Sequence, residues 1–221
     1  METVLAIAAC GPRLELALAA PGLAAPGAIS LAGPTPRSEL VMAGVDLLLR
    51  AAGVERRRLE AVVATRGPGS FTGVRVALAT ASGLSLALGV PAFGFPSLLA
   101  QAARTDADEC LAVQPARRGF VYAQPFSRAR GWLAAGAEPR PVEVAALAES
   151  RLPVIGPPGV PLPEGTRVAP ASCGAAEAML RLLGAGESIE TAELVPVYVD
   201  PPPAAIPTRT LPPWPPSPKA S

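Results

Sequence analysis

Three short apolar segments with strand periodicity precede the first helical pattern in this chain of 221 residues. Residues 3–9 form an apolar run, and residues 14–18 alternate between leucine and other residues after a Gly-Pro turn. A third segment follows at residues 28–31, beyond a turn rich in glycine, proline and alanine. The pattern predicts a hairpin and a third strand before any helix.

The helical patterns begin after these strands. Thr35 is expected as the N-cap and Pro36 as the first residue of a helix that ends before Gly53. A buried strand is expected at residues 59–65, and a second helix at about residues 73–88. This second helix has almost no polar face, and its small residues would let another helix approach closely.

Residues 76–103 carry no charge, which raises the question of a membrane-spanning helix. Glycines and prolines interrupt this stretch, so a helix followed by a strand at residues 91–95 is favoured over a span. A short helix is then expected near residues 97–103.

A polar linker at residues 105–109 predicts the start of a second lobe. Strands are expected there at residues 111–113 and 119–126, and helices at residues 142–149 and 174–183. The chain is therefore divided into an N-terminal lobe (1–104) with a glycine-rich turn and partner-binding helices, a C-terminal lobe (105–200) and a proline-rich tail (201–221). The tail is expected to be disordered, because it cannot bury enough apolar surface to order itself.

The composition excludes several classes of function. The formal net charge is +1, so no strong overall field draws the chain onto nucleic acid or an anionic membrane. The chain has no histidine, which removes the usual general base and the commonest transition-metal ligand. Cys10, Cys110 and Cys173 are widely separated, which favours a reducing cytoplasm over disulfides or a zinc cluster. We expect no metal and no catalytic residue in this chain.

The glycine-rich turn lies between a predicted strand and a predicted helix, and reads Gly67-Pro68-Gly69-Ser70-Phe71-Thr72-Gly73, followed by Val74 and Arg75. Such a turn exposes N–H groups at a helix N-terminus, where they can bind an anion, and its serine and threonine can cap the helix. It lacks the ending of a P-loop and is not a dinucleotide fingerprint. An anion site and a purely structural turn both remain open on this pattern.

The sequence of the turn closely resembles the signature of the TsaB (YeaZ) family, which takes part in the biosynthesis of threonylcarbamoyladenosine (t6A) in tRNA. Further segments resemble the same family at residues 37–40, 91–98, 117–122 and 194–198. The resemblance implies an α/β, actin-like (ASKHA) fold with two lobes, each a mixed sheet with flanking helices. It also implies a non-catalytic scaffold or activator subunit of the t6A complex.

The resemblance further implies which partners the chain has. A TsaD-like catalytic paralogue would bind the N-lobe helices of this chain, and a TsaE-like ATPase would join the assembly. The chain would contact tRNA only indirectly, through the complex. ATP and metal are expected on these partner subunits, with no cofactor assigned to this chain. A homodimer through the same helices is a further expectation. The expected interface residues on the two helices are Leu40, Gly44, Leu47, Ala77, Ala81, Ser82 and Ser85.

The chain departs from the family pattern at several positions. Ala8-Ala9 stands where the family has Asp-Thr, Arg37 where it has His, and Pro115 and Phe120 where it has Asp and Glu. An actin-type nucleotide site needs carboxylates around its metal, so these changes weaken an alternative function as an ATP-dependent small-molecule kinase. A second alternative, a peptidase, has no histidine beside Ser70.

Overall fold

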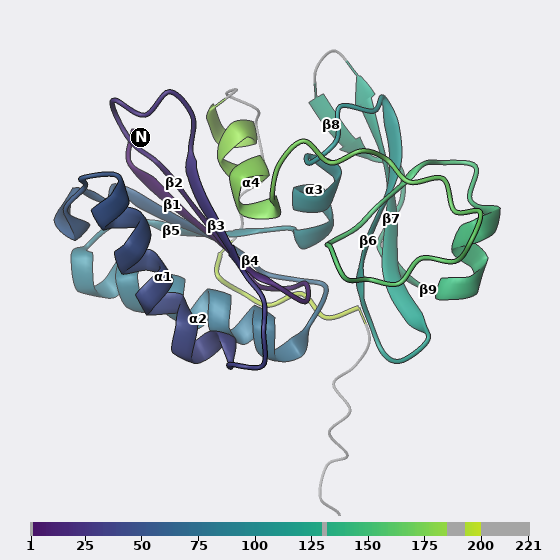
Figure 1. The fold of residues 1–221 in the computed structure, drawn as a ribbon, viewed down its shortest axis with the longest axis horizontal. Helices are drawn as coiled ribbons and strands as arrows, with labels where there is room; N and C mark the ends of the chain where they lie inside the picture. The colour runs from purple at the N-terminus through teal and green to yellow at the C-terminus, as the bar shows by residue number, and fades with distance from the viewer. Residues whose placement is uncertain (1, 130–131, 185–192, 200–221) are drawn as a thin grey trace, which may run out of the picture.

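Two mixed β-sheets with helices on their faces make up the computed structural model, which describes residues 2–129, 132–184 and 193–199 (Figure 1). The first sheet has the strand order β3-β2-β1-β4-β5. Strands β1 to β3 form an antiparallel meander, and β4 and β5 run parallel to β1. The strands span Val4–Ala8 (β1), Leu14–Ala19 (β2), Gly27–Leu31 (β3), Ala61–Thr65 (β4) and Ala92–Phe95 (β5). The predicted hairpin and third strand are confirmed.

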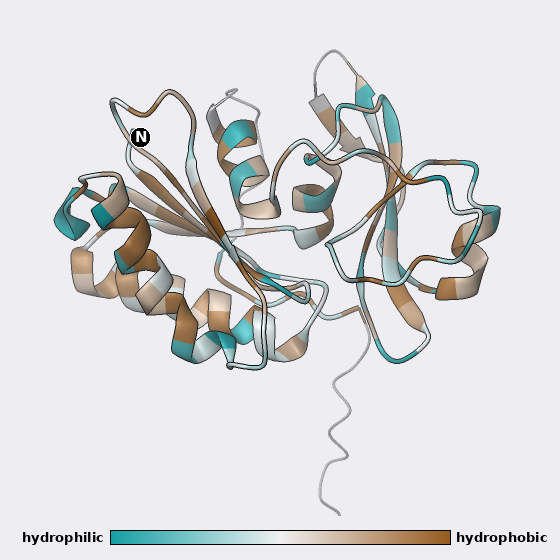
Figure 2. Ribbon diagram, in the orientation of Figure 1, coloured by the Kyte–Doolittle hydropathy of each residue, from teal (hydrophilic) through white to brown (hydrophobic). Residues whose placement is uncertain are grey.

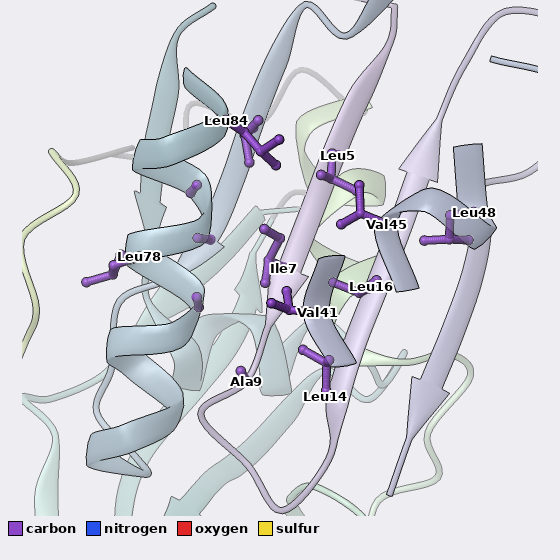
Figure 3. Packing of buried hydrophobic residues seen from close by; sticks show 14 of the residues in the cluster. Leu5, Ile7, Ala9, Leu14, Leu16, Val41, Val45, Leu48, Leu78 and Leu84 are labelled. Carbon is purple, nitrogen blue, oxygen red and sulfur yellow. The ribbon is translucent and has the colours of Figure 1, made fainter. Parts of the chain in front are cut away.

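Helices α1 (Arg37–Ala51) and α2 (Phe71–Leu88) cover one face of this sheet (Figure 1). Figure 3 shows how apolar side chains of both helices meet those of β1 and β2, among them Val41 and Val45 of α1 against Leu16. Figure 2 shows the same region as a mainly brown, hydrophobic layer. Burial of this layer is the main source of stability for the first lobe.

The start of α1 differs from the prediction by one residue. Pro36 is the N-cap, no side chain caps the helix, and Arg37 is its first residue. Thr35 is therefore not the cap. The start of α2 agrees with the turn chemistry, because Ser70 Oγ accepts a hydrogen bond from the N–H of Gly73 at 3.2 Å.

Helix α2 is, within the described part of the chain, the one helix long and apolar enough to cross a membrane by length and composition. Six of its residues are buried, including Ala77 and Ala81, and it packs mainly on β4 and β5. A helix that covers a sheet in a globular lobe has the same composition, since its buried face must be apolar.

The second sheet has the order β10-β6-β7-β8, and β9 also pairs with β7. Its strands span Glu109–Pro115 (β6), Phe120–Ala129 (β7), Trp132–Ala135 (β8), Arg140–Glu143 (β9) and Val154–Ile155 (β10). The helix predicted at residues 142–149 is partly wrong: Val142 lies in β9, and a 3-10 helix, η2, covers only Val144–Glu149. The reason is that pairing of Val142 with Val121 of β7 outweighs the local helical pattern.

A further 3-10 helix, η1, lies in the first lobe and spans Arg56–Arg58.

Two further helices pack against the sheets and against each other. Helix α3 (Ser97–Ala102) follows β5 and packs on β6, and α4 (Ala175–Gly184) packs on β1 and β2, on the face opposite α1 and α2. Residues 174–183, which the sequence assigns to the second lobe, therefore lie on the first sheet. The buried carboxylate of Glu15 in β2 accepts a hydrogen bond from the first N–H of α4, at Ala175. A negative charge at a helix N-terminus is stabilised by the helix dipole.

Arg104 holds the segments between the lobes together. The residue is 5% exposed, and its guanidinium donates to Gln101 Oε1 at 2.6 Å, to the carbonyl of Gly156 at 2.7 Å and to that of Cys173 at 2.9 Å. Burial lowers the pKa of Arg104, and the nearby Glu15 charge raises it. The three acceptors come from α3, from the loop after β10 and from the approach to α4, so one side chain fixes all three.

Candidate functional site at the glycine-rich turn

Hydrogen bonds anchor the backbone of the glycine-rich turn to two neighbouring segments. The N–H of Ser70 donates to the carbonyl of Cys10 at 2.8 Å, and the N–H of Ser97 donates to the carbonyl of Gly67 at 2.9 Å. The hydroxyl of Ser97 also donates to the carbonyl of Pro68. These bonds join the turn to the end of β1 and to the start of α3. Two N–H groups that an anion would need, those of Ser70 and Gly73, donate to protein acceptors instead.

Two glycines of the turn are required by close approach of the backbone. A Cβ atom at Gly69 would lie 2.6 Å from the carbonyl oxygen of Cys10, and the φ of Gly69 is +151°. A Cβ atom at Gly73 would overlap the carbonyl oxygen of Ala9 and lie 2.8 Å from Arg37 Nη1. The turn therefore packs directly on the end of β1, which supports the structural interpretation of these glycines.

Arg37 bridges the helix pair and the first strand. Its Nη1 donates to Ser70 Oγ and to the carbonyl of Ala9, both at 3.2 Å. Burial lowers the pKa of Arg37, and the nearby Cys10 raises it. The position that has His in the related family thus carries a half-buried cation that joins α1, α2 and β1.

The potential nucleophiles at the turn are not activated. Burial raises the pKa of Cys10 to about 11, against hydrogen bonds from Thr65 and Ser97 that lower it, so the thiol is protonated at neutral pH. Ser70 Oγ serves as the cap of α2, and the chain has no histidine to act as its base.

The positions that depart from the family pattern carry no carboxylate at the strand ends. Ala8 is buried at the end of β1, and Pro115 ends β6. The ring of Phe120 lies 4.2 Å from the guanidinium carbon of Arg117 in a cation–π contact. Nothing at these residues supplies the oxygen ligands that a nucleotide-bound metal would need.

The segment 193–199, called the strap below, lies across the turn. The N–H of Val197 donates to the carbonyl of Arg66 at 2.7 Å, and Leu194 packs against the core beneath α1 and α2. The ring of Tyr198 lies 5.6 Å from that of Phe71, and the guanidinium carbon of Arg75 lies 3.9 Å from the Phe71 ring centre. This contact between segments far apart in the chain was missed in the sequence, where only the resemblance at residues 194–198 signalled it.

The seven expected interface residues separate into two groups. Gly44, Ala77 and Ala81 are buried beneath the helices and face the sheet, as the clash of a Cβ at Gly44 with Leu16 shows. They do not form an outward surface. Leu47 and Ser82 are exposed, and Leu40 and Ser85 are half-buried.

The outward side of α1 and α2 carries three large apolar side chains, of which the sequence singled out Leu47 but neither Met42 nor Leu86. Leu86 of α2 is 88% exposed, Leu47 of α1 is 57% exposed, and Met42 is 38% exposed. The two helices lie side by side on the same face of the sheet (Figure 1). Exposed apolar side chains that form one contiguous patch are typical of a protein interface, and these three belong to adjacent helices.

Comparison with known proteins connects this arrangement with tRNA modification. A family model described as TsaD, tRNA N6-adenosine threonylcarbamoyltransferase, matches residues 36–156. The tRNA threonylcarbamoyladenosine biosynthesis protein TsaB of Escherichia coli K12 is 32% identical over 99 residues, 43% of this chain and 43% of that protein. An uncharacterized protein of Mycobacterium leprae is 52% identical over 64 residues, 29% of this chain and 18% of that protein. The matched region thus spans less than half the length of these curated relatives.

A solved structure agrees with the fold over nearly the whole chain. YeaZ from Pseudomonas aeruginosa superposes with a TM-score of 0.73 and 26% identity, covering 90% of this chain and 100% of that chain. A second structure, described as similar to peptidase YEAZ from Pseudomonas aeruginosa, gives a TM-score of 0.71 and 25% identity over the same shares. Both lobes therefore have counterparts in these structures.

Proposed function

This chain belongs to the TsaB (YeaZ) family, within the wider group that the TsaD family model describes, and on that premise we propose that it is a non-catalytic scaffold and activator subunit of the t6A modification complex. Its actin-like fold, with two mixed sheets and flanking helices, is that of the family. The complex modifies tRNA in the cytoplasm, and this chain contributes a binding surface to it.

The observation that carries the proposal is the exposed apolar surface on α1 and α2, formed by Met42, Leu47 and Leu86 and called the helix face below. A partner that presents its own helix pair can cover this surface with bundle-like packing. A TsaD-like paralogue is the proposed partner, because it shares the fold and so has an equivalent pair of helices. A homodimer in the free protein would cover the same surface.

The chemistry of the turn supports a non-catalytic role. Cys10 is protonated and buried, Ser70 caps a helix, and the positions Ala8, Pro115 and Phe120 carry no carboxylate for a nucleotide-bound metal. ATP and metal are therefore assigned to the partners, the TsaD-like paralogue and a TsaE-like ATPase. tRNA modification by this chain alone is not part of the proposal.

Co-expression with candidate TsaD-like and TsaE-like proteins tests the proposal. The chain should co-purify with the TsaD-like protein, and threonylcarbamoyl transfer to tRNA should require all three. Transfer that is equally fast when this chain is omitted would contradict the activator role.

Charge substitutions test the surface. Leu47→Glu and Leu86→Glu should each weaken binding of the TsaD-like protein more than about tenfold, because they bury an unpaired carboxylate. Both side chains are exposed, so melting should hardly change. The matched control is Val168→Glu in the second lobe, since Val168 is 57% exposed, as is Leu47. An equal loss of binding in the control, or none in either helix variant, would place the interface elsewhere.

A further inference from the structure

The contact between the strap and α2 forms an ordered column of three side chains. Arg75 lies on one side of the Phe71 ring at 3.9 Å, and Tyr198 packs on Phe71 with a ring separation of 5.6 Å and an angle of 36°. Phe71 and Arg75 are one turn apart on α2, whereas Tyr198 comes from the other end of the described chain. We call this group the aromatic column.

The aromatic column is held in place before any ligand binds. The hydrogen bond from Val197 to the carbonyl of Arg66 fixes the strap one residue before Tyr198, and Leu194 anchors its beginning in the core. The side chains nevertheless remain accessible, with Phe71 and Tyr198 each 40% exposed. An aromatic ring that is fixed but half-exposed loses little conformational freedom when a flat ligand stacks on it.

The local charge decides which kind of ligand fits. Residues 61–105 contain no Asp or Glu, and within the described ranges neither Arg66 nor Arg75 forms an ion pair. The strap contributes a single carboxylate, that of Glu193, so the surroundings of the column are only weakly cationic. A phosphate attached to the ligand therefore meets little repulsion here, and a flat ring gains from stacking.

We propose that the aromatic column is a stacking platform for an unpaired nucleobase, supplied by single-stranded RNA or by a free nucleotide. Nucleobases stack on Tyr and Phe irrespective of sequence, because every base has a π-face. Arg75, whose guanidinium lies over the Phe71 ring, adds the combination of arginine and aromatic side chains that recurs in recognition of unpaired bases. The platform adds a ligand to the proposed function. It rests on that function in one respect only, the expectation that the base belongs to tRNA.

The stacking platform is distinct from the helix face. Leu86 lies near the end of α2, whereas Phe71 is its first residue, so one helix would serve both a protein and a base. A contact of the column with the protein partner is the competing explanation, and the experiment separates the two.

The experiment is a titration of the full chain, without partners, into a 5′-labelled adenine-rich RNA octamer, followed by fluorescence anisotropy. A second arm uses unlabelled AMP and follows its H2 and H8 protons by NMR, because stacking on an aromatic ring moves these signals upfield. Binding of the octamer alone assigns the platform to RNA, and binding of AMP as tightly as the octamer assigns it to a free nucleotide.

Substitutions in the strap make the result specific. Tyr198→Ala should weaken binding about tenfold and abolish the upfield shifts, whereas Tyr198→Phe should preserve both because the ring remains. Val195→Ala is the matched control, since Val195 lies in the same strap and is 54% exposed. The affinity for AMP should depend only weakly on salt, because a mononucleotide offers few phosphate contacts.

Three outcomes would overturn the inference: no binding of octamer or AMP, binding that Tyr198→Ala leaves unchanged, or loss of TsaD-like binding in Tyr198→Ala with RNA binding intact. The last result would assign the column to the protein interface. Because these titrations contain no partner protein, their failure is distinguishable from failure of the scaffold proposal, which the co-purification and transfer assays test.

Discussion

Arg37 Nη1 lies 3.2 Å from Ser70 Oγ, so a residue at the start of α1 contacts the N-cap of α2. The same nitrogen donates to the carbonyl of Ala9, at the end of the first strand. The two helices of the helix face are thus fixed to each other and to the sheet at their N-termini. Removal of either the half-buried guanidinium or its acceptors would leave polar groups without hydrogen-bond partners.

Replacing Arg37 should therefore destabilise the fold. Arg37→Ala is expected to lower the free energy of unfolding by about 1–3 kcal/mol, since two hydrogen bonds to a charged donor are lost. Urea denaturation measures this loss. Arg50→Ala is the matched control, because Arg50 is an exposed arginine in the last turn of the same helix, and it should cost no more than about 1 kcal/mol. Equal losses for the two variants would contradict the bridging role.

Two glycines of α2 should respond to the same substitution in opposite directions. Gly73→Ala places a methyl group against the carbonyl of Ala9, and should lower the stability by about 3 kcal/mol or more. A methyl group at Gly83 would have no neighbouring atom within 4 Å, and Gly83 lies on the exposed side of the same helix. Gly83→Ala should raise the stability by about 0.5–1 kcal/mol. A Gly73→Ala protein that melts at the wild-type temperature would contradict the close packing of α2 on β1.

Removing the guanidinium of Arg104 should loosen the connection between the lobes. Arg104→Gln loses contacts with three segments and should lower the stability by about 2–4 kcal/mol. Hydrogen exchange should accelerate in α4 and in residues 153–160, both next to the lost bonds. Arg151→Gln, at an exposed position of the second lobe, should change neither quantity. Unaltered exchange in α4 would show that other contacts hold that helix.

The Cys10 thiol should make stability fall at alkaline pH. Burial raises its pKa from 9.0 to about 11 in the folded protein, so above pH 9 the unfolded chain loses the proton first. The free energy of unfolding contributed by this group is constant below pH 9, falls between pH 9 and 11, and is lower by up to about 3 kcal/mol above that range.

Denaturation at intervals from pH 8 to 11 measures this dependence. Cys10→Ala should flatten the decline, whatever its effect on stability at pH 8. Cys173→Ala is the comparison: burial raises the pKa of this half-buried thiol less, so its removal should flatten the decline less than Cys10→Ala does. A decline that is equally steep without Cys10 would assign it to other groups.

Local chemistry made much of the first lobe predictable. The local signals each act over a few neighbouring residues. Strand β2 forms where the alternation at residues 14–18 lies, and α2 begins after the turn, at the capping Ser70. The same reasoning was wrong only at the start of the helix predicted at residues 142–149, where pairing of Val142 with β7 keeps the chain in a strand. A strand pairing across 21 residues is not visible in a local helical pattern.

Local sequence patterns were limited in the same way at the candidate site, because they do not reveal which segments meet. Periodicity identified an apolar side of α1 and α2, but it could not tell the side that meets the sheet from the side that meets a partner. Gly44, Ala77 and Ala81 consequently lie inside, whereas Leu86, which was not singled out, is the most exposed large apolar residue of α2. The contact between Tyr198 and Phe71 depends on chain segments more than a hundred residues apart, which no window of sequence contains.

Helix α4 also has a consequence for the order in which the protein folds during its synthesis. The face of β1 and β2 opposite α1 and α2 is covered by α4, and Glu15 finds its partner in the N–H of Ala175, 160 residues later. A ribosome that has produced both helices and all five strands of the first sheet has therefore not yet produced the layer that shields its second face. The nascent N-terminal half should expose that apolar surface until α4 has been synthesised, which makes it a natural client for chaperones that bind nascent chains.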